Sequence, residues 1–265
     1  MDNHRNRYLF YDKNNSFEVA LFSTVGDRED QQDSSGVFLR YNEGIITIAD
    51  GMGGAEGGRL AADIAVKNTI DGYESLDYIE DFTEFFIENV KQSDFRINNL
   101  KNKNGEKIGA GSTLVSIALR DCYLHWISVG DSRIYFCNGN NLTQLTKDHN
   151  YFLALNEGVA CGEVDSEEYE KEKVKGEALI SYLGIGNLKL VDINQEPFRL
   201  QKDDMVMLSS DGLYKVLDNE TIFNILNNFK NINDAALALE QKSAKVAQKK
   251  NILRDNTTFA IIKKY

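Results

Sequence analysis

The N-terminal part of the chain carries its apolar residues in short runs, and these runs predict strands over residues 17–25, 36–41 and 44–49. Apolar side chains occupy both faces of many of these runs, a pattern typical of strands buried between two layers. The last two strands are joined by a tight turn at Asn42-Glu43. A sheet with both faces covered is therefore expected from the first fifty residues.

The pattern then changes to a helical period, which predicts two helices over residues 57–72 and 78–100. In the second helix the apolar residues recur at steps of three and four, with one step of seven that passes Ser93. This stripe faces a sheet, and we interpret its aromatic residues as core rather than as a cofactor pocket. The stripe consists of Ile79, Phe82, Phe86, Val90, Ile97 and Leu100.

Strands return after residue 110, separated by turn residues as in an antiparallel meander. Two further helices are predicted over residues 219–229 and 233–249. Residues 150–177 are rich in Glu and Lys without periodic apolar positions, so we expect them to be exposed and mobile. The other predicted strands cover residues 112–119, 123–129, 133–136, 142–145, 178–183, 188–193, 205–209 and 257–263.

Runs of strands interrupted by two helix pairs favour an α+β fold, a central antiparallel β-sandwich flanked by pairs of α-helices. The chain has no linker rich in Pro, Gly or Ser and no internal repeat. We therefore expect residues 1–265 to form a single domain, with a short N-terminal extension over about residues 1–15.

Composition narrows the possible partners. The formal charge of -11 argues against nucleic acid or an anionic membrane, since both favour clustered Lys and Arg. The three cysteines have no paired spacing, so neither a disulfide framework nor a CxxC zinc site is expected. No long apolar run occurs. These features predict a cytoplasmic protein, which we expect to be a monomer.

Four aspartates lie at the ends of predicted strands. Asp50 and Asp211 each end an apolar run before a glycine, Asp255 precedes the last strand, and Asp33 lies in a polar loop. Each alone is typical of a turn. Together they favour a shared site for Mg²⁺ or Mn²⁺, because converging carboxylates repel one another without a cation and these ions prefer oxygen ligands. The carbonyl of Gly51 can also reach a metal. The spacing does not show that these groups converge.

Arg28 lies five residues before Asp33 in the stretch GDREDQQD. Its guanidinium could grip two oxygens of a phosphate beside the metals. It could equally be an exposed loop arginine that pairs with Glu29 or Asp30. The residues alone leave both interpretations open.

Taken in order, seven stretches of the chain resemble the metal-dependent serine/threonine phosphatases of the type 2C family, in its compact bacterial form. A single Asp-Gly pair is weak evidence, but the ordered series is specific and extends from Gly26 to the C-terminus. The stretches are GDREDQQD, ADGMGGAEGG, GAGSTLV, VGDSRIY, LTKDHN, SSDGLYKVL and RDNTTFAII.

The resemblance implies a two-metal centre with Mn²⁺ or Mg²⁺ at one end of the sandwich. It assigns Asp33, Asp50, Asp211 and Asp255 as metal ligands through their carboxylates and Gly51 through its carbonyl. It assigns Arg28 to phosphate binding and Asp131 to a weaker third metal site. The implied reaction is direct attack on a phosphoserine or phosphothreonine of a protein substrate by a metal-bridging hydroxide, opposing a Ser/Thr kinase.

Several positions depart from the family pattern. Met52 stands where many members have a histidine proposed as a general acid, and Met cannot donate a proton. Gln31 and Gln32 stand where the family often has Asn and Glu. Lys215 stands where some members have an acidic residue near the third metal, which argues against that site. Residues 150–177 correspond to the variable flap of the family.

Two alternatives to a protein phosphatase remain open: a catalytically silent phosphoprotein-binding module on the same fold, and a phosphatase of small phosphorylated metabolites. The presence of four aspartates and Arg28 favours activity, since a silent module has no physical need to hold them together. His149 is expected to bond a loop backbone rather than to act in catalysis. Cys161 in the flap could be redox-sensitive.

Overall fold

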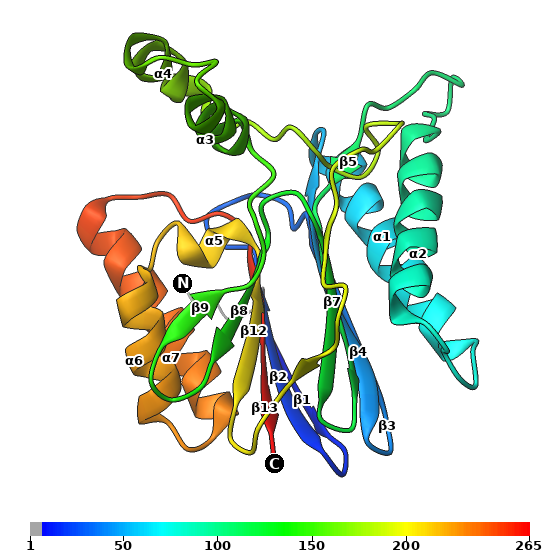
Figure 1. Ribbon diagram of the computed structural model, residues 1–265, viewed down its shortest axis with the longest axis vertical. Helices are drawn as coiled ribbons and strands as arrows, with labels where there is room; N and C mark the ends of the chain where they lie inside the picture. Colours follow the sequence, from blue (N-terminus) through cyan, green and yellow to red (C-terminus); the bar gives the residue numbers. More distant parts are fainter. Residues whose placement is uncertain (1–6) are drawn as a thin grey trace.

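The computed structural model describes residues 7–265. Two antiparallel sheets face each other, and helices cover the outer face of each sheet (Figure 1). The α+β sandwich predicted from the pattern is therefore confirmed. Strands that are apolar on both faces lie between the other sheet and a helix layer, which explains why their sequences do not alternate.

The first sheet has six strands in the order β1-β2-β13-β12-β8-β9. All of its neighbouring pairs are antiparallel, and β13, the last strand of the chain, lies between β2 and β12. The strands are β1 (Arg7–Lys13), β2 (Phe17–Thr24), β8 (Arg133–Cys137), β9 (Leu142–Gln144), β12 (Met205–Ser209) and β13 (Thr257–Lys264).

The second sheet is built on the order β10-β7-β6-β4-β3, with β11 also paired to β7 and β5 to β4. Its strands are β3 (Asp33–Arg40), β4 (Glu43–Met52), β5 (Gly111–Ser112), β6 (Leu114–Arg120), β7 (Tyr123–Val129), β10 (Asp192–Ile193) and β11 (Phe198–Arg199).

Two helix pairs complete the four layers. Helices α1 (Ala55–Glu74) and α2 (Phe82–Asn98) cover the second sheet, and α6 (Asn219–Asn228) and α7 (Ile232–Lys250) cover the first. One apolar core lies under each pair, and a third fills the space between the sheets. Helix α2 begins later than predicted because the side chain of Asp81 accepts hydrogen bonds from the first backbone N–H groups and caps the helix there.

Part of the predicted N-terminal extension forms a strand. Residues 1–6 lie outside the described part of the chain, but Arg7–Lys13 forms β1 and pairs along its length with β2. This strand is mostly exposed and carries charges at both ends, so it has no apolar alternation to reveal it. It is held by backbone hydrogen bonds at a sheet edge.

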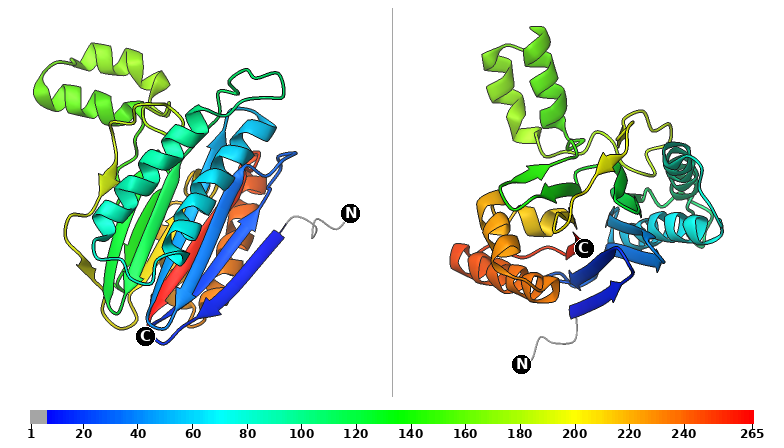
Figure 2. Two further views of the ribbon diagram at one scale, coloured as in Figure 1. Left: turned by 90° about the vertical axis from the view of Figure 1, so that its right-hand side faces the viewer. Right: turned by 60° about the horizontal axis from the view of Figure 1, so that its bottom comes forward.

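The segment after residue 150 also differs from the prediction. It contains helix α3 (Tyr151–Cys161), helix α4 (Ser166–Glu172) and a short 3₁₀ turn (Lys173–Lys175), which project from the sandwich (Figure 2). Residues 178–183 make only single bridges, to Asn150 and Ser112, and form no strand. Side-chain caps at Asn150 and Asp165 fix the two helix starts without any apolar stripe.

No helix within residues 7–265 is both long enough and apolar enough to cross a bilayer.

Candidate metal centre

The pairing of β3 with β4 brings two of the predicted aspartates together. Asp33 is the first residue of β3 rather than a loop residue, and in the antiparallel register it stands directly opposite Asp50. Opposite residues of such a pair have Cβ atoms about 4.5–5.5 Å apart. Two carboxylates 17 positions apart in the chain are thus neighbours because of one hairpin.

Asp33 is the buried member of this pair, with 7% of its surface exposed. The hydroxyl of Ser210 donates a hydrogen bond of 2.8 Å to Oδ2, whereas the buried Oδ1 has no hydrogen-bond partner in residues 7–265. Burial raises the pKa of Asp33 to about 7, against the opposing effect of the nearby Thr258 and Ser210 hydroxyl groups, and repulsion from Asp211 and Asp255 adds to the rise. The site therefore buries a carboxyl group of which one oxygen has no hydrogen-bond partner among the described residues.

Asp50 and Gly51 are fixed by their backbones. The N–H of Asp50 donates to Oγ1 of Thr113 at 3.0 Å, and its carbonyl accepts from the N–H of Thr113 at 2.8 Å. At Gly51 a Cβ would lie 2.0 Å from the carbonyl oxygen of Gly58, so only glycine fits between β4 and the start of α1. Burial, followed by repulsion from the neighbouring aspartates, raises the pKa of Asp50 well above its usual value.

Asp211 begins α5 (Asp211–Tyr214), a single turn that the sequence pattern did not predict. That turn places Lys215 beside it, with Nζ 2.8 Å from Oδ2 of Asp211 and 3.9 Å from Oδ2 of Asp131. Asp131 is itself buried, and burial together with repulsion from Asp211 raises its pKa to about 6. Burial alone would lower the pKa of Lys215, but its attraction to Asp211 and Asp131 and its hydrogen bond to Asp211 raise it.

Arg28 pairs with neither Glu29 nor Asp30. Its Nη2 donates to Oδ2 of Asp255 at 2.6 Å, across 227 positions of sequence. The hydrogen bond to Asp255, the attraction to it, and weaker attractions to Asp211 and Asp50 raise the pKa of Arg28. The structure thus removes the local-pairing interpretation and brings the guanidinium to the aspartates.

One open cleft of about 510 Å³ collects these groups. Arg28, Asp50, Gly51, Asp131, Asp211 and Asp255 all line it, together with Met52 and Lys215. Asp33 does not line the cleft but lies buried beside Asp50. Every residue singled out in the sequence as a ligand or phosphate contact is therefore at this one end of the sandwich.

Two residues that support the cleft were missed by the sequence analysis. Ser210 bonds Asp33, and its oxygen also accepts the N–H of Thr258 at 3.0 Å, so it links β12, β13 and β3. The side chain of Asn256 accepts the N–H of Gln32 and donates to the carbonyls of Val25 and Asp30, which ties down the loop that carries Arg28. Their positions beside Asp211 and Asp255 were the only available signal.

The expectation that His149 is structural is confirmed. Its buried Nδ1 accepts the N–H of Gly130 at 3.1 Å, and its backbone N–H donates to the carbonyl of the same residue. The side chain of Gln31 also bonds to the backbone, because its Oε1 accepts a hydrogen bond from the N–H of Asp33 at 3.1 Å. Cys161 is exposed at the end of α3, in the segment that projects from the body.

The donor set of the cleft fits hard divalent cations. All the candidate ligands offer oxygen, and the unpartnered Oδ1 of Asp33 is the strongest single indication of a missing positive charge. Within the described residues no three His, Cys, Asp or Glu side chains are arranged to hold an ion by themselves. Mg²⁺ binds through one or two carboxylates and keeps several waters. The arrangement therefore suits an ion held largely through water, and argues against zinc.

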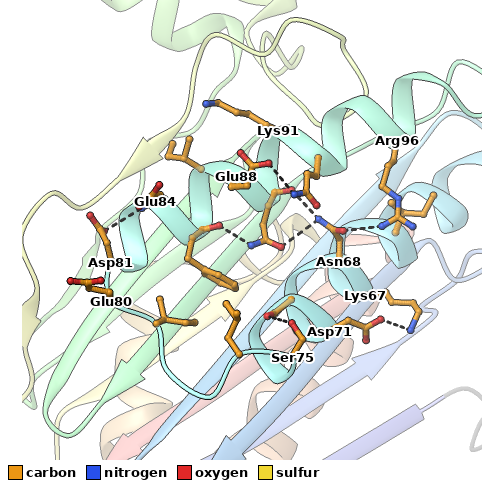
Figure 3. Close-up of a pocket in the computed structure, with 18 of the residues that line it drawn as sticks. Lys67, Asn68, Asp71, Ser75, Glu80, Asp81, Glu84, Glu88, Lys91 and Arg96 are labelled. Atoms are coloured by element: carbon orange, nitrogen blue, oxygen red, sulfur yellow. Dashed lines mark hydrogen bonds and ion pairs between the residues drawn. The ribbon is translucent and has the colours of Figure 1, made fainter.

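A larger cavity of about 1090 Å³ lies elsewhere, in the groove between α1 and α2 (Figure 3). Several of its polar side chains bond to one another: Lys67 pairs with Asp71, and the side-chain amide of Asn68 donates to Asn89 and Ser93 and accepts from Arg96. None of the candidate ligands lines this groove. The candidate ligands are therefore found at the smaller cleft and not in this groove.

Comparison with known proteins identifies the class. The family model of protein phosphatase 2C matches residues 24–250, so the chain belongs to the protein phosphatase 2C family. A serine/threonine phosphatase of Listeria welshimeri is 28% identical over 213 residues, which cover 79% of this chain and 82% of the relative. The chain is accordingly a bacterial protein-serine/threonine phosphatase.

Solved structures share the fold. A serine/threonine phosphatase of S. agalactiae aligns with a TM-score of 0.79 at 24% identity, covering 93% of this chain and 99% of its own. The catalytic domain of the phosphatase PstP, solved in complex with two manganese ions, aligns with a TM-score of 0.69 at 24% identity, covering 94% and 98%. The sandwich of this chain is thus a scaffold on which a two-manganese phosphatase has been observed.

Proposed function

We propose that the chain hydrolyses phosphoserine and phosphothreonine on protein substrates, using two divalent cations, Mn²⁺ or Mg²⁺, in the carboxylate cleft. The observation that carries this proposal is Asp33, a buried carboxylate with one unpartnered oxygen beside Asp50. A fold has no reason to retain such a group without a cation to neutralise it. The phosphorylated substrates imply a Ser/Thr kinase that modifies the same proteins.

In this proposal Asp33, Asp50, Asp211 and Asp255 hold the ions with their carboxylates, and Gly51 holds one with its carbonyl. When bound, such cations lower the pKa of a water that attacks phosphorus and neutralise the phosphoryl oxygens. Ser210 keeps Asp33 oriented through its hydrogen bond to Oδ2, so that Oδ1 remains available. This orientation is fixed before any ligand arrives, which is what preorganised electrostatic catalysis requires.

Arg28 would bind the phosphoryl group. Only its Nη2 contacts Asp255, and 62% of the side chain is exposed, so its remaining N–H groups are free to donate to two phosphate oxygens. Asn256 holds the loop beneath it by three hydrogen bonds and thereby limits how far the guanidinium can move. Met52 lines the cleft but has no proton to donate, so it is not a general acid.

The direct test is hydrolysis of p-nitrophenyl phosphate and of a phosphothreonine peptide with manganese, with magnesium and with a chelator. We expect turnover of both substrates with a metal and none with the chelator. No turnover of either substrate with any metal would remove the proposal, and would favour a silent binding module. Turnover of p-nitrophenyl phosphate but not of the peptide would instead point to small phosphorylated metabolites.

A further inference from the structure

Lys215 places a positive charge inside the candidate metal centre. It follows directly after α5, so the helical step of four residues sets its ammonium beside Asp211 at 2.8 Å. The same nitrogen lies 3.9 Å from Asp131 and 3.5 Å from Glu177, the last residue of the projecting segment. Three carboxylates from different parts of the chain thus surround one lysine.

This lysine is built into the site and is not a loose surface charge. More than half of its side chain is covered, and its nearest partners, Asp131 and Asp211, are 9% and 19% exposed. A lysine ammonium in such surroundings is charged at neutral pH. Asp131 also has its backbone fixed, because the hydroxyl of Tyr214, the residue before Lys215, donates to its carbonyl at 2.9 Å.

We propose that Lys215 is a tethered cation that occupies the corner between Asp131 and Asp211, and that it keeps a divalent ion out of that corner. The proposal rests on the function proposed above, in which Asp211 is also a metal ligand. Because the ammonium engages only Oδ2 of Asp211, the other oxygen of that carboxylate can still bind an ion on its far side. The cleft therefore takes two divalent ions and not three.

The exclusion follows from distance and charge. An ion coordinated by Oδ2 of Asp211 at about 2.1 Å would lie no more than about 5 Å from a nitrogen that is 2.8 Å from the same oxygen. Repulsion between the two cations in a partly dry cleft disfavours such an ion strongly. Moving the ammonium away would break its contacts with Asp211, Asp131 and Glu177 together.

The test counts bound ions and does not depend on activity. Metal-free protein is titrated with Mn²⁺, and the free ion is measured by its electron paramagnetic resonance signal. We expect the wild type to bind two ions and Lys215→Asp to bind three. Lys230→Asp makes the same charge change at an exposed position outside the cleft and is expected to bind two. In the double variant Lys215→Asp with Asp131→Asn the added ion is expected to disappear.

Two results would overturn the proposal: a wild type that already binds three ions, or a Lys215→Asp variant that binds no more than the wild type. If Lys215→Asp does not fold, Lys215→Met removes the charge at similar length and should gain a weaker third ion; no gain would be equally decisive. A wild type that binds fewer than two ions would contradict the two-metal function. In that case the numbers of ions bound by the wild type and by the Lys215 variant are still compared, so the role of Lys215 is tested separately.

Discussion

Arg254 and Asp255 are consecutive residues, yet their side chains belong to two opposite kinds of charged cluster. Arg254 meets Glu240 of α7 with both terminal nitrogens, and Arg7 of β1 adds a second positive charge at 3.2 Å. Glu240 is 2% exposed and is compensated by these two arginines. Asp255 instead joins three other aspartates, Asp50, Asp131 and Asp211, in the lining of a cleft whose positive side chains are Arg28 and Lys215.

The first cluster contains its own countercharge, whereas in the function proposed above the carboxylates of the second are neutralised by bound cations. At Glu240 the chain supplies the countercharge, so the carboxylate is satisfied without help. In the cleft the pKa values of Asp33, Asp50 and Asp131 are raised, with burial as the leading cause in each case and repulsion from neighbouring aspartates added. Two adjacent residues can therefore be read as structural and functional from the balance of charge around them.

The largest effect is expected from breaking the compensated cluster. Glu240→Gln leaves Arg254 buried without its anion, and removing one partner of a buried pair costs about 3–5 kcal/mol of the free energy of unfolding. Urea denaturation of the metal-free protein measures this loss. Activity at low temperature should persist, because Glu240 lies outside the cleft. A loss below about 1 kcal/mol would show that the pair is not needed for stability.

The reverse outcome is expected in the cleft. Asp50→Asn should lower kcat/KM for p-nitrophenyl phosphate by about 10²–10³-fold, the size of losing one preorganised charge. It should not destabilise the metal-free protein, because it removes a carboxylate that its neighbours repel. Asp211→Asn should behave in the same way. If either variant kept full activity, it would not be a metal ligand.

The pH dependence of stability should also distinguish the two clusters. A carboxyl whose pKa is raised in the folded state binds protons more tightly there than in the unfolded chain, so its contribution is present at low pH and lost as pH rises through the folded value. For Asp131 and Asp33 that window runs from the unfolded value near 4 up to about 6 and about 7. We expect the metal-free protein to lose several kcal/mol across it, because each pKa unit of the shift corresponds to about 1.4 kcal/mol.

Manganese supplies the control for this prediction. Adding Mn²⁺ at pH 7.5 should raise the melting temperature of the wild type, since an ion that binds only the folded state stabilises it. The same addition should do little for Asp50→Asn. A metal-free protein whose stability rises between pH 5 and 7 would contradict the raised pKa values.

A smaller loss is expected at the arginine of the cleft. Arg28→Ala removes charge-assisted hydrogen bonding to phosphate worth about 1.5–3 kcal/mol, so kcat/KM should fall by about 10–100-fold. Arg28→Lys keeps the positive charge but not the planar guanidinium group, so it should recover only part of the lost kcat/KM. Steady-state kinetics on the phosphothreonine peptide separate the two variants. An unchanged kcat/KM in Arg28→Ala would remove Arg28 from the site.

The pattern of apolar and polar residues predicted the strands and helices that bury an apolar face. Buried strands carry continuous apolar runs, and Asp50 and Asp211 stand out because a charge followed by glycine ends such a run. The two sheets follow from the apolar runs and both helix pairs from their helical period, whereas the enzyme class was predicted from the resemblance of seven ordered stretches to a known family. Strand β1 and helices α3 and α4 bury little apolar surface and were missed, since pairing and caps hold them rather than an apolar stripe.

The contacts that assemble the cleft could not be predicted because they join distant parts of the chain. Ser210 bonds Asp33 across 177 positions, and Asn256 bonds the backbone of Gln32 across 224. The pairing of Arg28 with Asp255 is of the same kind. No sequence period connects such residues. They are brought together by the order of the strands in the two sheets. Lys215 was noticed as a departure from a family pattern, but its three carboxylate partners appear only in the fold.

The smallest effect is expected for a pair that is neither buried nor in the cleft. Lys67 and Asp71 are one helical turn apart on α1, with side chains 76% and 53% exposed. Water already solvates both charges, so Asp71→Asn should change the free energy of unfolding by no more than about 0.5 kcal/mol and leave kcat/KM unchanged. The same urea denaturation used for Glu240→Gln measures it. Both variants remove one carboxylate charge, so the difference between their free energies of unfolding isolates the effect of burial. If Asp71→Asn lost as much stability as Glu240→Gln, pairing of the charges would matter whether or not they are exposed.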